Sequence, residues 1–162
     1  MTLIKSISGI RGTIGGSIGE NLTPVDAVKF AAGYGAWLKS KNDKCTVVIG
    51  RDARPSGLMI ENLVISTLQG LGINVINTGL STTPTVEMLV TRYKAEGGII
   101  LTASHNPKQW NALKLLNKKG EFVSGQDGAT ILELAEGGTI QFADVDDLGT
   151  LTTCEDGLAW HI

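Results

Sequence analysis

A serine, a histidine and an asparagine follow an apolar run near the middle of the chain, in the segment GGIILTASHNP (97–107). The run is typical of a strand buried on both faces of a sheet, and Asn106-Pro107 favours a turn directly after it. We therefore expect the Ser104 hydroxyl to project from a rigid sheet edge. Because no Gly-x-Ser-x-Gly elbow surrounds Ser104, and adjacent side chains of an extended segment point apart, His105 is poorly placed to deprotonate it. A serine that carries a phosphoryl group fits this pattern better than a hydrolase nucleophile.

A lysine follows this serine in the stretch NALKLL (111–116). Leu113 and Leu115 flank Lys114, which places the lysine on the opposite, polar face of a strand. Lys114 is therefore a candidate acid/base for the chemistry at Ser104. A lysine that is merely solvated on a strand is the alternative.

Two further segments set arginines between glycines: GIRG (9–12) and GRDARPSG (50–57). Glycine allows the close backbone approach of a phosphate-binding loop, and arginine offers a planar fork of donors to phosphate oxygens. We expect both segments, with TASHNP (102–107), to be loops at the carboxyl edge of a sheet, where ligands collect. For Arg11 the alternative is a surface arginine in a turn. For Arg51, Asp52 and Arg54 it is a local ion pair that braces the loop.

Segments with the hydrophobic patterns of helices and of strands alternate along the chain, and these elements must position the residues named above. The sequence predicts helices over 22–41, 58–72, 82–97 and 125–138, strands over 45–50, 73–79 and 98–103, and a hairpin over 112–124. Two of the helices open with a threonine cap followed by proline, at Thr23-Pro24 and near Thr82. This alternation predicts an α/β fold with a largely parallel sheet and helices on its faces.

Composition limits the class of protein. The 162 residues amount to about one domain, and a net charge of −2 with 42% hydrophobic residues argues against disorder and against a basic nucleic-acid surface. No apolar run is long enough to span a bilayer, and MTLIKSISGIRG lacks the apolar centre of a signal peptide, so we expect no membrane role and a cytoplasmic location. Cys45 and Cys154 are expected to be reduced packing residues.

The ordered set of GIRG, GRDAR, TASHNP and the lysine of NALK resembles the α-D-phosphohexomutases, the family of phosphoglucomutase, phosphomannomutase and phosphoglucosamine mutase. The resemblance covers the whole chain. It implies the family's first domain, a three-layer α/β/α fold with a mixed, mostly parallel sheet, over residues 1–143. Residues 144–162 would then be a linker toward a second domain.

The resemblance also implies roles for individual residues. Ser104 would carry the phosphoryl group, His105 would orient substrate or move protons, and Lys114 would be the general acid/base. Arg11, Asn106 and Arg51 would bind the phosphosugar. Mg²⁺ would be held in part through the Ser104 phosphate, by ligands that this chain does not supply, and a hexose 1,6-bisphosphate would serve as activator.

The family's further domains are missing from this sequence. The acidic residues Asp144, Asp146 and Asp147 lack the spacing of a metal loop and are expected to be solvated. The chain is thus expected to be inactive alone, to depend on the remaining domains of the same enzyme, and to self-associate through the face that a second domain would cover. Two alternatives stay open: a stand-alone module that binds phosphate or sugar phosphate, and a regulatory domain without turnover.

Overall fold

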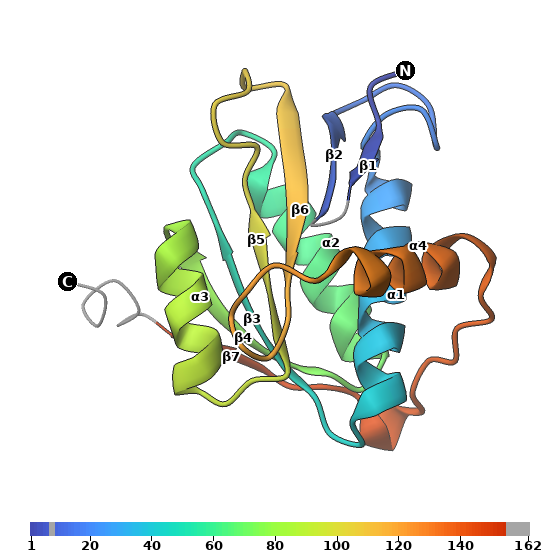
Figure 1. Cartoon of the computed structure of the whole chain (residues 1–162), viewed down its shortest axis with the longest axis vertical. Helices are drawn as coiled ribbons and strands as arrows, with labels where there is room; N and C mark the ends of the chain where they lie inside the picture. The colour runs from blue at the N-terminus through green and yellow to red at the C-terminus, as the bar shows by residue number, and fades with distance from the viewer. Residues whose placement is uncertain (7–8, 155–162) are drawn as a thin grey trace.

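A seven-stranded mixed sheet with helices on both faces forms the molecule (Figure 1). The computed structural model describes residues 1–6 and 9–154, so the expectation that Trp160, His161 and Ile162 belong to a linker lies outside the described residues. In chain order the elements are β1 (Ile4–Ser6), β2 (Gly9–Thr13), α1 (Pro24–Lys41), β3 (Thr46–Arg51), α2 (Gly57–Gly70), β4 (Asn74–Leu80), α3 (Thr83–Arg92), β5 (Gly97–Leu101), β6 (Trp110–Leu116), α4 (Gly125–Gly137), the 3-10 helix η1 (Val145–Asp147) and β7 (Leu151–Thr153). Within the described ranges, none of the helices has both the length and the hydropathy that a membrane span requires.

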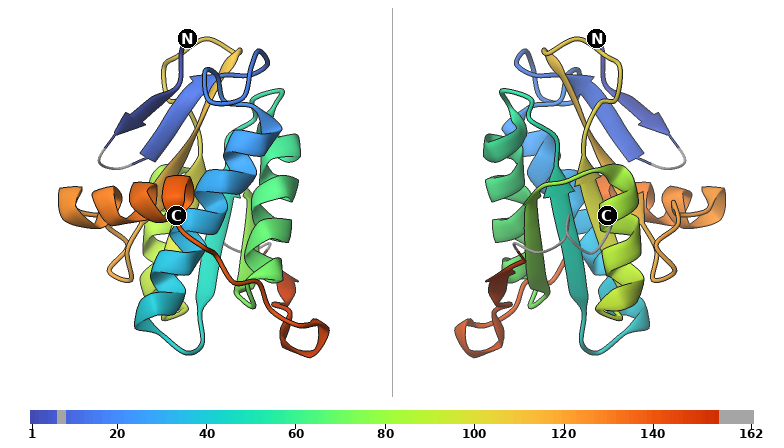
Figure 2. Two further views of the ribbon diagram at one scale, coloured as in Figure 1. Left: turned by 90° about the vertical axis from the view of Figure 1, so that its right-hand side faces the viewer. Right: turned by 90° about the vertical axis from the view of Figure 1, so that its left-hand side faces the viewer.

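The sheet separates two hydrophobic cores. Helices α1, α2 and α4 cover one face, where Phe30 and Leu68 pack with Ile99 of β5. Helix α3 covers the other face, where Leu89 packs with Ile100. Figure 2 shows the two helical layers on opposite sides of the sheet. The predicted three-layer α/β/α fold is therefore confirmed.

The strand order β1-β2-β6-β5-β3-β4-β7 divides the sheet into two halves. From β5 to β7 every pairing is parallel, whereas β1, β2, β6 and β5 pair antiparallel. The sheet is mixed as predicted, and parallel pairing is confined to the half that the βαβ crossovers build. The antiparallel half arises because β6 returns along β5 and the N-terminal segment joins β6 as strands.

The helices begin where the capping signals predicted. Thr23 and Asp26 form a capping box at α1, in which each side chain accepts a hydrogen bond from the other residue's backbone N–H. The Thr82 hydroxyl caps α3 in the same position. Helix α3 ends at Arg92, short of the predicted residue 97, because Lys94 adopts a φ of 53° and turns the chain toward β5.

The segment GIRG (9–12) is a correction to the sequence analysis, since it lies in strand β2 and not in a loop. Ile10 is 1% exposed and packs in the larger core, so the segment is held as a strand by burial. A Cβ at Gly9 would overlap the Leu113 carbonyl of β6, and one at Gly12 would lie 3.1 Å from the Leu22 nitrogen. These glycines therefore allow close packing of the backbone.

Two other predicted elements differ from the structure. The expected hairpin over 112–124 is reduced to strand β6 and a single bridge between Leu116 and Phe122, because β2 and β5 already pair with both edges of β6. Within the expected linker, Leu151–Thr153 forms strand β7, which pairs parallel with β4. The acidic residues around η1 are exposed, and the domain boundary at 143 stays a prediction.

Tyr34 of α1 is a buried polar link between this helix and the sheet. Its hydroxyl accepts a hydrogen bond from the Gly98 N–H at 2.9 Å and donates to the Leu116 carbonyl at 2.5 Å, where β5 meets β6. A side chain at Gly97 would collide with this hydroxyl. Burial raises the pKa of Tyr34 far above its usual value, so the phenol stays neutral.

We predict that Tyr34→Phe lowers the free energy of unfolding by about 1–3 kcal/mol, because buried backbone groups of β5 and β6 lose their partner. Urea denaturation checks this value. Gly97→Ala should also destabilise the protein, but by less in the Tyr34→Phe background, where the colliding hydroxyl is gone. Additive effects of the two substitutions would contradict the link.

Both cysteines are buried and unpaired, as expected of packing residues. Burial raises the pKa of the Cys45 thiol from 9.0 to about 11. Because the folded state favours the neutral thiol, its contribution to stability is complete below pH 9 and is lost as the pH rises toward 11.

We therefore predict that the urea midpoint falls between pH 9 and pH 11, and that Cys45→Ala makes this fall shallower. One thiol can change the free energy of unfolding by at most about 1.4 kcal/mol per pH unit. Equal slopes for the two proteins would show that Cys45 does not contribute.

Candidate active site

Ser104 stands on a tight turn beyond the buried strand β5. All five residues of β5 are buried, and the chain emerges at Thr102 and Ala103 to reach the exposed serine. The Asn106 N–H donates to the Ala103 carbonyl at 3.0 Å and closes the turn. Within it Ser104 has a φ of 55°, a left-handed conformation that is uncommon for any residue other than glycine. Ser104 and His105 thus lie in a turn, and the extended geometry assumed from the sequence is wrong.

Lys114 reaches Ser104 from strand β6. It pairs with Ile100 in the antiparallel register of β5 and β6, one residue before the end of β5. Leu113 and Leu115 are buried on the other face of the strand, as the alternation predicted. The Lys114 ammonium donates to the Ser104 hydroxyl with an Nζ to Oγ distance of 2.6 Å. The structure therefore brings together the two residues that the sequence proposed for the chemistry.

Arg11 lies on β2 beside this pair. Gly9 faces Lys114 and Arg11 faces Ala112 across the β2–β6 ladder, so Arg11 and Lys114 lie on the same face of the sheet. Together with Ser6 they line a hollow of about 230 Å³. Two cations in one shallow hollow beside a serine hydroxyl form a surface that can bind an anion.

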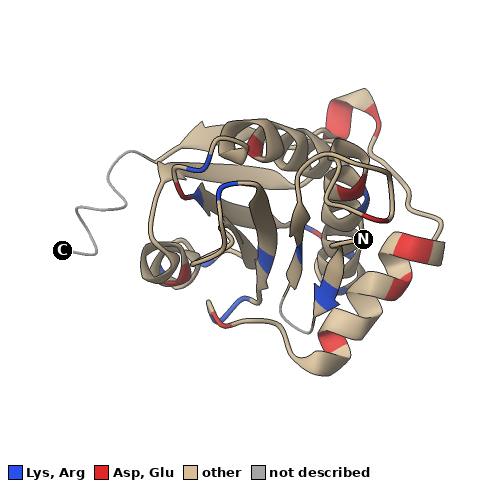
Figure 3. Ribbon diagram, turned by 90° about the horizontal axis from the view of Figure 1, so that it is seen from above, with Lys and Arg blue, Asp and Glu red and all other residues tan. Residues whose placement is uncertain are grey.

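Figure 3 views this edge of the molecule from above. Basic segments lie on the central strands, and acidic segments mark the helix at the lower right as well as several loops and other helices.

His105 and Asn106 follow Ser104 in the turn. His105 is exposed and Asn106 is half-buried. In the described part of the chain, neither side chain makes a hydrogen bond, and both are open to a ligand. The structure places them next to Ser104 in the chain but brings neither into contact with Lys114.

Arg51 is held away from this hollow by an ion pair. Its Nε lies 3.2 Å from a carboxylate oxygen of Glu61, which is 3% exposed, and its Nη1 donates to the Asp52 carbonyl. Asn77 of β4 donates to the same carboxylate. These contacts fit the bracing alternative for Arg51, because a phosphate would have to compete with a buried carboxylate for the guanidinium.

The sequence analysis missed two polar residues beside the site, Thr102 and Asn111. The Thr102 hydroxyl donates to Asp52 and accepts from the Ser104 N–H, and the Asn111 amide donates to Ser56 at the start of α2. Thr102 lies inside the quoted TASHNP motif, and its hydroxyl directly after a buried strand was the available signal. Asn111 is fully buried, and nothing in the sequence distinguishes it from a polar residue on the exposed face of a strand.

No metal cage is built from the described residues, among which no three histidine, cysteine, aspartate or glutamate side chains lie close enough to hold an ion. Lys114, which contacts Ser104, is cationic, and the Asp52 carboxylate of the neighbouring loop is already engaged by Arg54 and Thr102. These residues alone do not build a site for Mg²⁺, and we derive no chemical step through one.

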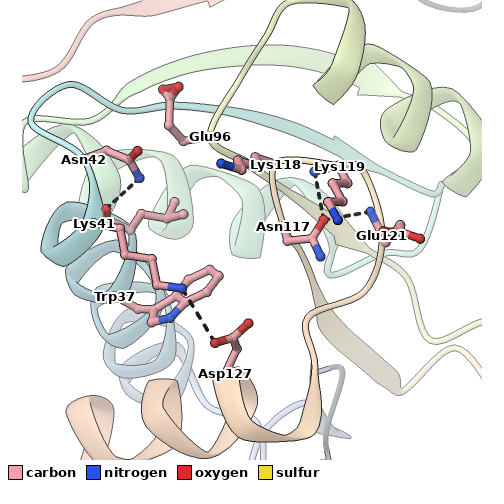
Figure 4. Close-up of a pocket in the computed structure, with 10 residues that line it drawn as sticks. Trp37, Lys41, Asn42, Glu96, Asn117, Lys118, Lys119, Glu121 and Asp127 are labelled. Atoms are coloured by element: carbon pink, nitrogen blue, oxygen red, sulfur yellow. Dashed lines mark hydrogen bonds and ion pairs between the residues drawn. The ribbon is translucent and has the colours of Figure 1, made fainter.

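A second hollow, of about 310 Å³, lies at the opposite end of β5 and β6 (Figure 4). Lys41 lies over the Trp37 ring there and pairs with Asp127 at 3.7 Å. Three lysines and three carboxylates line it, so the charges cancel. This hollow lacks the excess of cations that the surface around Arg11 offers.

Comparison with known proteins shows the family to which the chain is related. A family model described as "Phosphoglucomutase/phosphomannomutase, alpha/beta/alpha domain I" matches residues 3–141. A "Phosphoglucomutase/phosphomannomutase" of Thermococcus kodakarensis is 35% identical over 86% of this chain and 31% of its own length. A "Probable phosphoglucosamine mutase" of Pyrococcus horikoshii is 36% identical over 90% of this chain and 31% of its own length.

A solved structure supports the same relationship. The crystal structure of a putative phosphomannomutase from Thermus thermophilus matches with a TM-score of 0.79 and 25% identity, over 96% of this chain and 34% of that one. This chain thus spans about a third of the length of the relatives it matches. From its motifs, its fold and these similarities, the chain belongs to the phosphoglucomutase/phosphomannomutase family and matches the family's α/β/α domain I.

Proposed function

We propose that Ser104 is the phosphoryl carrier of a phosphohexomutase that interconverts hexose 1-phosphate and hexose 6-phosphate through a bisphosphate intermediate. The observation that carries the proposal is the 2.6 Å contact between Lys114 Nζ and Ser104 Oγ. A hydroxyl becomes a nucleophile only when its proton has an acceptor nearby, and a general acid/base must lie within hydrogen-bond reach of that proton.

The transfer step balances with this chain's own residues. In the neutral form of its amine, Lys114 takes the proton of Ser104 as Oγ attacks a phosphoryl group of a hexose 1,6-bisphosphate. The bond from Oγ to phosphorus forms, the bond from phosphorus to the sugar oxygen breaks, and the Lys114 ammonium gives its proton to that oxygen, which leaves as a hydroxyl. In the return step the neutral Lys114 takes the proton of the attacking substrate hydroxyl and gives it to Oγ of Ser104 as the phosphoryl group passes to the substrate.

The surrounding residues bind the substrate in this proposal. Arg11 contacts a phosphate of the sugar in the shared hollow, since its exposed guanidinium lies on the same face as Lys114. His105 and Asn106 flank Ser104 and orient the sugar. Arg51 acts at most indirectly, through the loop that it braces.

Other parts of the enzyme complete the site. Mg²⁺ would neutralise charge on the transferring phosphoryl group, and its remaining ligands would come from outside the described residues. We propose that this chain works as one domain of a longer cytoplasmic enzyme and is inactive alone. Leu58, Met59 and Leu80 are exposed apolar side chains that a neighbouring domain or a second copy could cover.

We predict that the complete polypeptide carrying this domain gains one phosphate, at Ser104, when it is incubated with Mg²⁺ and glucose 1,6-bisphosphate. Intact-mass and peptide mass spectrometry locate the modification. Ser104→Ala should abolish it and lower kcat by at least about a thousandfold. Mutase activity that survives Ser104→Ala would sink the proposal. Phosphosugar binding without phosphorylation would instead favour the binding-module alternative.

A second prediction concerns the lysine. Lys114→Met should lower kcat by about 10²–10⁴-fold, because the proton of Ser104 loses its acceptor. Lys108→Met is the matched control, since Lys108 is an exposed lysine of the loop that carries Ser104, and it should stay within about twofold of the parent. Steady-state kinetics of both variants make the comparison, and equal losses would show that charge alone matters.

A further inference from the structure

The guanidinium of Arg54 contacts three backbone carbonyls, two in the loop that carries Ser104 and one at the start of β6. Arg54 comes from the segment between β3 and α2, and the serine loop is residues 102–109. Nη2 of Arg54 donates to the Ser104 carbonyl at 2.8 Å, and Nη1 donates to the carbonyls of Pro107 and Trp110 at 2.8 and 3.1 Å. One side chain thus ties together the start and the end of the serine loop.

Asp52 holds this guanidinium in place. Its carboxylate accepts from the Arg54 Nε at 3.1 Å and from the Arg54 backbone N–H at 3.2 Å. The same carboxylate accepts from the Thr102 hydroxyl at 2.6 Å, and that hydroxyl accepts from the Ser104 N–H at 3.1 Å. A closed ring of hydrogen bonds therefore runs from the N–H of Ser104 through Thr102, Asp52 and Arg54 to the carbonyl of Ser104.

This ring holds the peptide groups on both sides of a strained residue. A left-handed φ of 55° is unfavourable for a serine and persists only where surrounding contacts determine it. We propose that Arg54 is a positioning residue that, with Asp52 and Thr102, keeps Ser104 in this conformation and so aims its hydroxyl at Lys114. The inference deepens the proposed function and rests on it for its catalytic meaning.

The geometry requires an arginine at this position. Only a planar fork with several N–H donors serves Asp52 and three carbonyls at the same time, and the single ammonium of a lysine does not. The Arg54 side chain is 10% exposed, which leaves the serine loop as its main partner. Arg51, three residues earlier at the end of β3, pairs with Glu61 and supplies a control of equal charge.

The test follows Ser104 itself in this chain by NMR. Backbone chemical shifts and scalar couplings report its φ, and amide exchange reports its N–H relative to the core amides of Ile99 and Ile100. In Arg54→Ala we expect Ser104 to move to a negative φ and its amide to exchange at least about tenfold faster, with the core amides unchanged. Arg54→Lys should behave like Arg54→Ala, and Arg51→Lys should leave Ser104 as in the parent.

Each outcome decides the proposal. An unchanged φ and exchange rate in Arg54→Ala overturn it, and so does rescue by Arg54→Lys or an equal effect of Arg51→Lys. If Arg54→Ala does not fold, Arg54→Lys and Thr102→Val give the same comparison, because each breaks the ring at one link. These measurements do not require phosphoryl transfer. The positioning role of Arg54 can therefore be overturned by NMR whether or not mass spectrometry finds phosphate on Ser104.

Discussion

The antiparallel pairing of β5 with β6 is the constraint on which the site depends. Strand β5 is buried on both faces between β3 and β6, so its position is determined by the two cores. Because β6 runs back along it, the connecting loop must leave and re-enter the sheet at one edge. That return places Ser104 and Lys114 within contact although ten residues separate them. A slip of one residue would turn Lys114 to the opposite face and end the contact.

In the candidate site, hydrogen bonds hold the serine loop, while its polar side chains are exposed to solvent. Partly buried hydrogen bonds of Asp52, Thr102 and Asn111 hold the serine loop on the side of the protein, whereas Ser104 and His105 are exposed on the other. A serine held in an unfavourable conformation by its neighbours needs little reorganisation before reaction. The cationic hollow beside it distinguishes this end of the sheet from the other end, where the hollow is balanced in charge.

Local sequence signals were enough to predict the helices and the proposed catalytic pair, whereas the features that depend on long-range strand pairing could not be predicted. Thr23 and Thr82 act through neighbours three residues away, so sequence alone showed where α1 and α3 begin. Strand β7 has no such signal, because Leu151–Thr153 becomes a strand only through β4. The glycines of GIRG suggested a loop, and their actual role depends on how closely β6 approaches Gly9 and Leu22 approaches Gly12. Sequence likewise could not separate Arg51 from Arg54, since only the fold decides which arginine meets the serine loop.

The strand order also has a consequence for the time at which each part of the sheet is completed during synthesis. β2 pairs with β6, about a hundred residues later in the chain, and β4 receives its outer neighbour only from residues 151–153. Neither side of the sheet can therefore be completed before these late segments are synthesised. Ile10 lacks its neighbour Leu113 until β6 has left the ribosome. Such distant contacts slow folding and leave unpaired strand edges open to other chains. A nascent chain of this protein is thus most vulnerable to misassociation before residue 116 emerges.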